Sequence, residues 1–344
     1  MSEKLWFLSD YTEGAHPEVL KKLMDENMTH LVGYGADEAT AAAKAKICAA
    51  CGRDDLQIWF LSGGTQTNQV AISAMLRSCE GVVAATTAHV NGHEAGAIEY
   101  SGHKVLAVPH VNGKVTASVL RTYMDNHFRE SSWEHLVQPG MVYISHPTEY
   151  GTLYSKQELS ELSAVCREYS LPLYMDGARL GYGLMSEGSD LTLSDICELT
   201  DLFYIGGTKV GALCGEALIF TKQNMPKNFL AIVKQRGALL AKTRVVSLQF
   251  DALFTDGLYE RLGRHAVELA MKIKRAFVEK GYTLHMDSPT NQQFIVLDKA
   301  TMERLRQYAE FDVWEWVDDD NAAVRFATSW ATTEEDVDKL IELI

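Results

Sequence analysis

Two short apolar runs in this chain each end at a charged residue, an acid in the first and a lysine in the second. Residues 171–175 lead into Asp176, and residues 203–207 lead into Thr208 and Lys209. Buried parallel strands read as continuous apolar runs, and the side chains that follow them gather at the carboxyl edge of the sheet, where ligands bind. We therefore expect Asp176 and Lys209 to lie at one edge.

A lysine and a carboxylate at such an edge are the pair that pyridoxal 5′-phosphate requires. The lysine amine holds the cofactor as an imine, and the carboxylate keeps the pyridine nitrogen protonated, so that the ring accepts electrons. Taken singly, Asp176 as a helix cap and Lys209 as a solvated side chain are ordinary alternatives, because strand ends are rich in both residue types.

A second segment predicts a phosphate site. Residues 57–61 read as a strand that runs through Ser62, Gly63, Gly64 and Thr65 into an apolar helix. Free backbone N–H groups and the positive end of the helix dipole meet at such a turn, and both favour an anion. The segment has neither GxGxxG nor GKS/T spacing, so a nucleotide is not indicated, and an ordinary tight turn is the alternative.

His89 follows another buried strand, residues 82–85, which would place its imidazole over a flat ring at the same edge. The alternative is a hydrogen-bonded loop histidine, and it weighs more heavily on His93 and His103.

The composition argues against several classes of partner. A net charge of −14 repels nucleic acid and anionic membranes. No apolar run approaches the length of a membrane span, and the first residues turn polar too early for a secretory signal, so we expect a cytoplasmic protein. The six scattered cysteines suit a reducing compartment, and we interpret the Cys48–Cys51 pair as structural, with no metal site.

Expected strands and helices alternate along most of the chain. This alternation predicts an α/β fold with a mostly parallel sheet flanked by helices, in a large domain over residues 1–250 that includes an N-terminal arm. Residues 251–344 predict a small α+β domain, whose last helix begins with a capping box from Thr332 to Glu335.

Four segments follow one another in an order that a known family shares: Ser62-Gly63-Gly64-Thr65, His89, Asp176-Gly177-Ala178-Arg179 and Lys209. With Ser9-Asp10 near the start and residues 325–337 near the end, the chain resembles the threonine aldolase and β-eliminating lyase family of fold type I pyridoxal phosphate-dependent enzymes. Within that family it is most similar to the low-specificity L-threonine aldolases. The resemblance spans nearly the whole chain and implies a fold type I, transferase-like architecture.

The resemblance also implies roles for individual residues. Lys209 forms the imine, Asp176 pairs with the pyridine nitrogen and His89 stacks on the ring. The other implied cofactor contacts are Gly63, Gly64, Thr65 and Thr208, with Arg236 or Arg244 supplying positive charge to the phosphate. The implied substrate contacts are Ser9, Arg179 and Arg325, which grip the carboxylate, and Tyr34, which reaches the neighbouring subunit's site.

The chain departs from the family pattern at two places. Thr208 stands where serine is usual, and residues 210–215 lack the usual proline. The strand end that commonly reads Glu-Asn-Thr-His-Asn is replaced by residues 145–151, so the base that takes a substrate proton stays open among His89, His146 and Glu149.

The implied reaction is cleavage of the Cα–Cβ bond of a β-hydroxy amino acid, L-threonine or L-allo-threonine, to glycine and acetaldehyde. One alternative is β-elimination or transamination of another amino acid, with Lys209 as the proton carrier. Another is a ligand-binding protein that kept the fold. We expect a homodimer or homotetramer with shared sites, because no strand brings Tyr34 to its own sheet edge.

Overall fold

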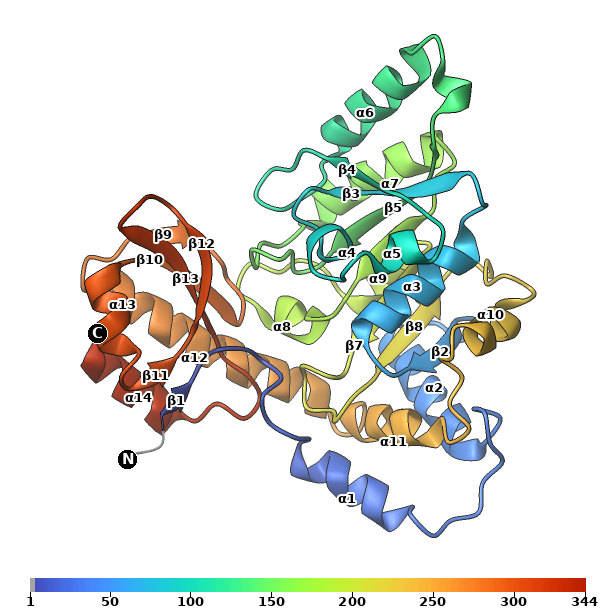
Figure 1. The fold of residues 1–344 in the computed structure, drawn as a ribbon. Coiled ribbons are helices and arrows are strands. Elements are labelled where there is room, and N and C mark those ends of the chain that lie inside the picture. The colour runs from blue at the N-terminus through green and yellow to red at the C-terminus, as the bar shows by residue number, and fades with distance from the viewer. Residues whose placement is uncertain (1–3) are drawn as a thin grey trace.

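The computed structural model of the protein describes residues 4–344, and a seven-stranded sheet forms its larger part (Figure 1). The strands lie in the order β2-β8-β7-β6-β5-β3-β4. Their bounds are β2 Gln57–Leu61, β3 Glu80–Ala85, β4 Val105–Val108, β5 Gln138–Ser145, β6 Leu173–Asp176, β7 Leu202–Gly206 and β8 Glu216–Phe220. Neighbouring strands are parallel except at β8, which confirms the expected mostly parallel sheet.

Strand β8 runs antiparallel to both of its neighbours, β2 and β7. A parallel crossover needs a dozen or more residues, and the segment 207–215 is too short for one, so the chain turns back on itself. As a result β8 begins at the edge where β2 and β7 end. Glu216, its first residue, pairs with Leu61 on one side and Gly206 on the other.

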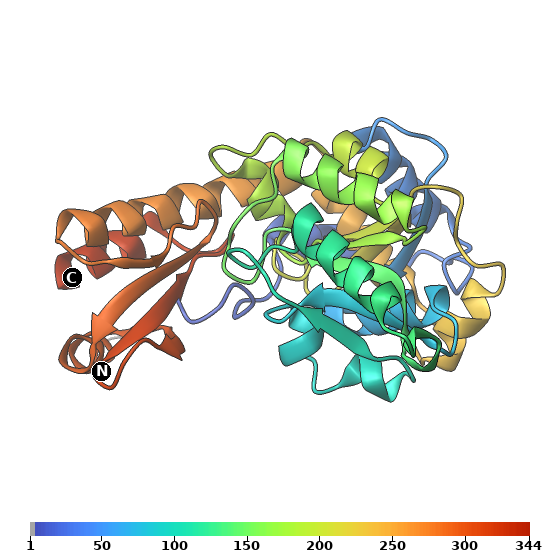
Figure 2. The same ribbon diagram turned by 90° about the horizontal axis from the view of Figure 1, so that it is seen from above.

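Helices flank this sheet, as Figure 2 shows from above. They are α1 Pro17–Asp25, α2 Glu38–Ala50, α3 Gly64–Met75, α4 His89–Gly92, α5 Ala97–Tyr100, α6 Ala117–Arg129, α7 Lys156–Glu168, α8 Leu180–Met185, α9 Leu193–Leu199, α10 Phe229–Gln235 and α11 Arg244–Leu253, with a 3₁₀ turn at Trp133–His135. Asp37 caps α2 by accepting from the Thr40 backbone N–H.

A four-stranded antiparallel sheet lies beside the large sheet, and the long helix α12 extends from one to the other (Figure 1). Its strands are β9 Leu284–Met286, β10 Gln292–Asp298, β12 Asp312–Trp316 and β13 Asn321–Ala327, and its helices are α12 Leu258–Glu279, α13 Lys299–Leu305 and α14 Glu334–Leu343. The predicted division between residues 250 and 251 falls inside α11 and stays a prediction about independently folding units.

The predicted cap of the last helix is wrong by one residue. Thr333, rather than Thr332, is the N-cap of α14, and its side chain accepts from the Asp336 backbone N–H. Thr332 is engaged elsewhere, because its hydroxyl accepts a hydrogen bond from the Ser329 backbone N–H and closes the preceding turn.

The N-terminal arm joins the two sheets. Strand β1 Leu5–Trp6 pairs in parallel with β11 Ala309–Glu310 beside the small sheet, and Phe7 is buried against Phe326. The chain then crosses to the large sheet and carries Asp10 into the site. Within residues 4–344 no helix combines the length and the apolar character that crossing a bilayer requires.

Candidate functional site

A cavity of about 290 Å³ lies at the edge of the large sheet where β2, β6 and β7 end and β8 begins. Most of the predicted site residues line it. They are Gly63, Gly64, Thr65, His89, Asp176, Arg179, Thr208 and Lys209. The structure therefore brings together residues that are up to 146 positions apart because parallel strands deliver their ends to one edge.

Asp176 ends β6 and is buried in a shell of donors. Its carboxylate accepts four hydrogen bonds, from Tyr143 Oη (2.6 Å), Tyr204 Oη (2.5 Å), Asn68 Nδ2 (3.0 Å) and the Ala178 backbone N–H (2.9 Å). Burial alone raises the pKa of a carboxyl, but His89 and these donors outweigh it and hold the pKa of Asp176 below its usual value. Asp176 is thus a fixed negative charge at neutral pH.

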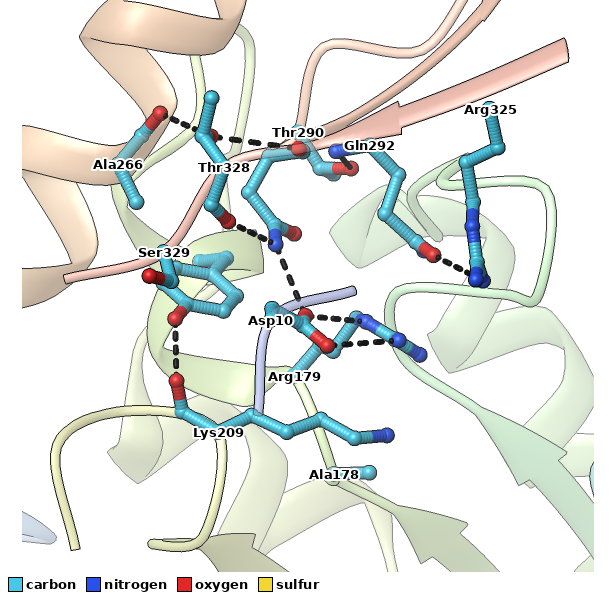
Figure 3. A network of polar contacts seen from close by, with 12 residues as sticks. Asp10, Ala178, Arg179, Lys209, Ala266, Thr290, Gln292, Arg325, Thr328 and Ser329 are labelled. Atoms are coloured by element: carbon cyan, nitrogen blue, oxygen red, sulfur yellow. Dashed lines mark hydrogen bonds and ion pairs between the residues drawn. The ribbon is translucent and has the colours of Figure 1, made fainter. Parts of the chain in front are cut away.

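Lys209 follows β7 and extends past Ala178 along the cavity (Figure 3). Its amine lies 5.8 Å from the centre of the Tyr11 ring, and its backbone carbonyl accepts a hydrogen bond from the Tyr182 hydroxyl. Burial and the neighbouring Arg179 lower the pKa of Lys209 below its usual value. A lowered pKa leaves more of the amine neutral, which is the nucleophilic form.

The turn between β2 and α3 leaves backbone donors free. Gly63 is the N-cap of α3 and has no side chain to accept from the helix N–H groups, while Gln66 Oε1 accepts from Ser62 instead. A methyl group placed on Gly63 meets nothing within 4 Å, whereas one on Gly64 lies 3.1 Å from the Tyr204 hydroxyl. This uncapped helix start, facing open space, suits a phosphate group.

His89 begins the short helix α4 at the cavity wall. Its Nδ1 lies 2.8 Å from Glu94 Oε1, and Glu94 is buried and also accepts from Asn68 Nδ2 at 2.8 Å. Asn68 thus donates to two carboxylates, that of Glu94, which holds His89, and that of Asp176. The imidazole is held in one orientation at this wall.

Of the two other candidate bases, Glu149 and His146, the structure places one at the cavity. Glu149 lines the cavity and accepts from the His89 backbone N–H (2.9 Å) and the Ser145 hydroxyl (2.6 Å). Burial raises its pKa above the usual value, against the lowering effect of those donors. A carboxylate with a raised pKa is a better proton acceptor at neutral pH.

His146 does not line the cavity. It is fully buried, its Nδ1 accepts from the Tyr154 backbone N–H at 3.3 Å, and burial lowers its pKa to about 4. Side chains alternate along β5, so that Tyr143 and Ser145 point toward Asp176 and Glu149, and His146 faces the other way. The structure therefore removes His146 from the candidate bases.

Arg179 is paired within the chain. Its guanidinium makes two parallel hydrogen bonds to Asp10 of the N-terminal arm, at 2.7 and 3.0 Å, and Asp10 also accepts from Asn291 Nδ2 at 2.9 Å (Figure 3). Burial raises the pKa of Asp10, but Arg179 and Lys209 outweigh it and lower the value to about 2. Asp10 is therefore ionised and ties the small sheet to the cavity.

Arg325 lies on β13 beside this network and is only 9% exposed (Figure 3). Its guanidinium lies over the Trp314 ring at 5.1 Å, and its nitrogens contact Gln292 Oε1 (3.1 Å), Asp312 Oδ2 (2.9 Å) and the Leu8 carbonyl (3.4 Å). Its Nε has no partner within the described chain. Arg325 is not among the residues that line the cavity, but burial and the nearby charge of Arg179 lower its pKa. Two neighbouring guanidinium groups favour a bound anion.

Besides His146 and Arg325, four further predicted residues are not among those that line the cavity of this chain. Ser9 is buried in the arm, and Tyr34 is half exposed beneath the Lys234 amine at 4.8 Å. Arg236 donates to the Ser101 carbonyl at 3.2 Å, and Arg244 donates to the Thr29 carbonyl. Neither arginine is among the residues that line the cavity.

Several residues of the site were not predicted. Glu216 and Tyr204 line the cavity, and Asn68 and Tyr143 donate hydrogen bonds to Asp176. The tyrosines carry a signal in the sequence, because each lies two positions before the end of a buried strand and so faces the same way as the strand's last residue. A buried tyrosine needs a partner for its hydroxyl. The sequence around Glu216 has no comparable pattern, because Glu216 reaches this edge of the sheet only through the antiparallel direction of β8.

Comparison with known proteins shows which family and which structures the chain is similar to. The sequence profile of the beta-eliminating lyase family matches residues 7–300. A low specificity L-threonine aldolase from a Pseudomonas species is 31% identical over 342 residues, which cover 97% of this chain and 95% of the relative. A solved structure of Leishmania major threonine aldolase shares 40% identity with a TM-score of 0.95, covering 98% of each chain.

A more distant likeness concerns the fold alone. The structure of an aspartate aminotransferase double mutant from Thermus thermophilus has a TM-score of 0.71 at 14% identity, and the alignment covers 99% of this chain and 91% of that one.

Proposed function

The chain belongs to the beta-eliminating lyase family, and from that membership we propose that it is a pyridoxal 5′-phosphate-dependent aldehyde-lyase of the threonine aldolase type. It cleaves the Cα–Cβ bond of L-threonine or L-allo-threonine to give glycine and acetaldehyde. Both the Pseudomonas and the Leishmania relatives carry threonine aldolase names, which favours aldol cleavage over β-elimination or transamination.

One observation carries the proposal. A lysine with a lowered pKa, a carboxylate held ionised by four donors and an uncapped helix start all open into one cavity. A free amine, a fixed negative charge and a set of backbone donors match the aldehyde, the pyridine nitrogen and the phosphate of the cofactor in turn. The donor set therefore fits pyridoxal 5′-phosphate, with Lys209 and Asp176 as its main partners.

The cofactor, when bound, accepts the electrons of whichever substrate bond is held perpendicular to its ring. The protein decides which bond that is by fixing the substrate carboxylate. We assign this task to Arg325 and Arg179, with Asp10 holding Arg179 in place. His89 and Glu149 are the groups placed to take the hydroxyl proton, and Glu149 has the pKa raised by burial that a base at neutral pH requires.

The product test separates the proposed reaction from its rivals. Purified protein supplied with pyridoxal 5′-phosphate and L-threonine is expected to release equal amounts of glycine and acetaldehyde, measured by amino acid analysis and by a coupled aldehyde assay. Release of ammonia and an α-keto acid would instead show β-elimination. Binding of threonine without any product would show a ligand-binding protein.

Replacement of Arg325 by lysine is expected to slow aldol cleavage by on the order of a hundredfold or more, while cofactor absorbance is retained. Arginine grips a carboxylate with two parallel hydrogen bonds, and the stacked guanidinium over Trp314 fixes their direction, whereas lysine offers a point charge. The measurement is kcat/KM for threonine. Arg306→Lys, at a cation–π contact with Phe311 in the small sheet region, is the matched control. Parental activity of Arg325→Lys would leave Arg179 as the carboxylate partner.

We also propose that the protein works as a homodimer or homotetramer with shared sites. Tyr34 is half exposed and lies outside its own cavity, and neither Arg236 nor Arg244 reaches the helix start that would take the phosphate. A second subunit can supply the missing charge. Light scattering at assay concentration is expected to show a dimer or tetramer, and a fully active monomer would contradict the proposal.

The six cysteines are free, and two of them, Cys51 and Cys197, are completely buried. Free thiols persist in a reducing compartment, so we propose the cytoplasm as the location. Cell fractionation followed by immunoblotting measures this directly.

A further inference from the structure

Glu216 is a buried carboxyl group at the cavity wall for which the reaction above gives no role. It begins β8, is 3% exposed and lines the cavity together with Lys209 and the turn 62–65. Because β8 is antiparallel, its first residue pairs with Leu61 just before that turn and with Gly206 just before Lys209. Glu216 therefore lies between the helix start that suits a phosphate and the segment that carries the lysine.

The contacts of Glu216 are to neutral donors. Its Oε1 accepts from the Thr208 hydroxyl at 2.8 Å, and its Oε2 accepts from the Gly207 backbone N–H at 3.1 Å. Thr208 Oγ1 in turn accepts from the Gly215 backbone N–H at 3.0 Å. Lys209 lines the same cavity and its charge lowers the pKa of Glu216, but among the described residues its amine makes no ion pair with Glu216.

An ionised Glu216 and a bound phosphate would disfavour each other. Like charges in a cavity that excludes water repel strongly, and the carboxylate would also take the single hydrogen of the Thr208 hydroxyl. A neutral carboxyl group reverses that hydrogen bond. Glu216 then donates to Thr208 Oγ1, and the Thr208 hydrogen is free to turn to the phosphate.

We propose that Glu216 carries a proton while the phosphate of the cofactor is bound, and that it thereby positions the Thr208 hydroxyl as a phosphate donor. This assignment deepens the proposed function and rests on it. Glu216 is a positioning residue, because it acts on the phosphate through Thr208.

The surroundings of Glu216 support a neutral form. Burial raises the pKa of Glu216 above its usual value, against the lowering effects of Thr208 and Lys209. Asp176, at the end of β6, adds a further raising effect. The other titratable groups that face it are Tyr204 on β7, Tyr174 on β6 and Tyr259 on α12. A bound phosphate dianion adds negative charge and pushes the equilibrium further toward the neutral acid.

The sign of the pH dependence follows from proton linkage. If the bound state holds a proton that the free state loses as the pH rises, phosphate affinity is full at low pH and falls by up to about tenfold per pH unit above the ionisation of free Glu216. Lys209 also loses its positive charge as the pH rises, and this loss weakens phosphate binding as well. A variant that changes Glu216 alone therefore isolates the contribution of Glu216 to the pH dependence of phosphate affinity.

The experiment compares pyridoxamine 5′-phosphate with pyridoxamine, because neither can form an imine with Lys209 and their ratio reports the phosphate alone. Apoprotein is titrated calorimetrically with both from about pH 7, where the phosphate is already mostly a dianion, to about pH 9. In the parental protein the preference for the phosphate form is expected to fall with pH. In Glu216→Gln, which is isosteric and cannot ionise, the fall is expected to be smaller by up to about tenfold per pH unit.

Glu80→Gln is the matched control. Glu80 is another buried glutamate that begins a strand, β3, but it lies at the opposite edge and pairs with Arg77, so its variant is expected to keep the parental profile. Difference infrared spectra of the parental protein provide a second readout. Binding of pyridoxamine 5′-phosphate is expected to give a protonated carboxyl band that Glu216→Gln lacks.

The outcomes are distinct. Equal pH profiles for the parental protein and Glu216→Gln would overturn the inference, and so would the absence of the protonated band. Absence of the band in the parental protein overturns the inference even if the variant fails to fold, because that result does not require the variant. A parental apoprotein with no preference for the phosphate form at about pH 7 would overturn the proposed cofactor itself.

Discussion

Replacement of Lys209 by alanine is expected to abolish covalent attachment of pyridoxal 5′-phosphate and to reduce threonine cleavage to the background rate. Lys209 is the lysine that lines the cavity, and burial together with Arg179 lowers its pKa, so that a neutral amine is available near neutral pH. Alanine has no amine to offer. The measurement is visible absorbance after dialysis, together with acetaldehyde release from L-threonine.

Borohydride reduction of the parental protein followed by peptide mapping locates the attachment. The pyridoxyl group is expected on Lys209. Lys234→Ala is the control, because Lys234 lies on the surface over the Tyr34 ring and its loss leaves the cavity intact. A label on Lys234 or Lys242 in place of Lys209 would contradict the assignment.

Asp176→Asn is expected to retain the fold and some cofactor but to lose turnover by on the order of a hundredfold or more. A neutral amide cannot hold the pyridine nitrogen protonated, so the substrate loses its electron sink. The amide nitrogen would also face hydroxyl and N–H donors that now point at a carboxylate, which costs about 1–3 kcal/mol for each donor left unpaired.

Two measurements test this variant. The first is kcat for glycine formation at saturating cofactor, and the second is the midpoint of urea unfolding. Because the pKa of Asp176 is held below its usual value, its charge is constant above mildly acidic pH, and the loss is expected to be the same across the neutral range. Near-parental turnover would remove Asp176 from its role.

The sequence predicts those site residues that lie at the ends of strands. Asp176 and Lys209 come at the ends of apolar runs that are typical of buried parallel strands, and such strands share a carboxyl edge. The exclusion of His146 was also within reach of the sequence. Side chains alternate along β5, so a cavity that takes Ser145 cannot also take the next residue.

The contacts that the sequence did not predict depend on pairings between distant segments. Asp10 meets Arg179 only because the arm crosses between the two sheets, and no local pattern specifies that path. Glu216 faces the cavity because β8 is antiparallel, which follows from a short connection rather than from the residues of the strand. The roles proposed for Tyr34 and Arg236 require a second subunit, and the pattern of residues in one chain does not describe contacts between chains.

The pairing of β1 with β11 has a consequence for synthesis on the ribosome. Lys4 and Glu310, which form an ion pair at this junction, are 306 positions apart, so roughly 15–60 s of translation separate their emergence. All seven strands of the large sheet precede residue 221, but Asp10 cannot be fixed against Asn291 until the segment that leads into β10 has been made. The contacts that fix Asp10 and Arg325 against the small sheet therefore become possible only with the last quarter of the protein.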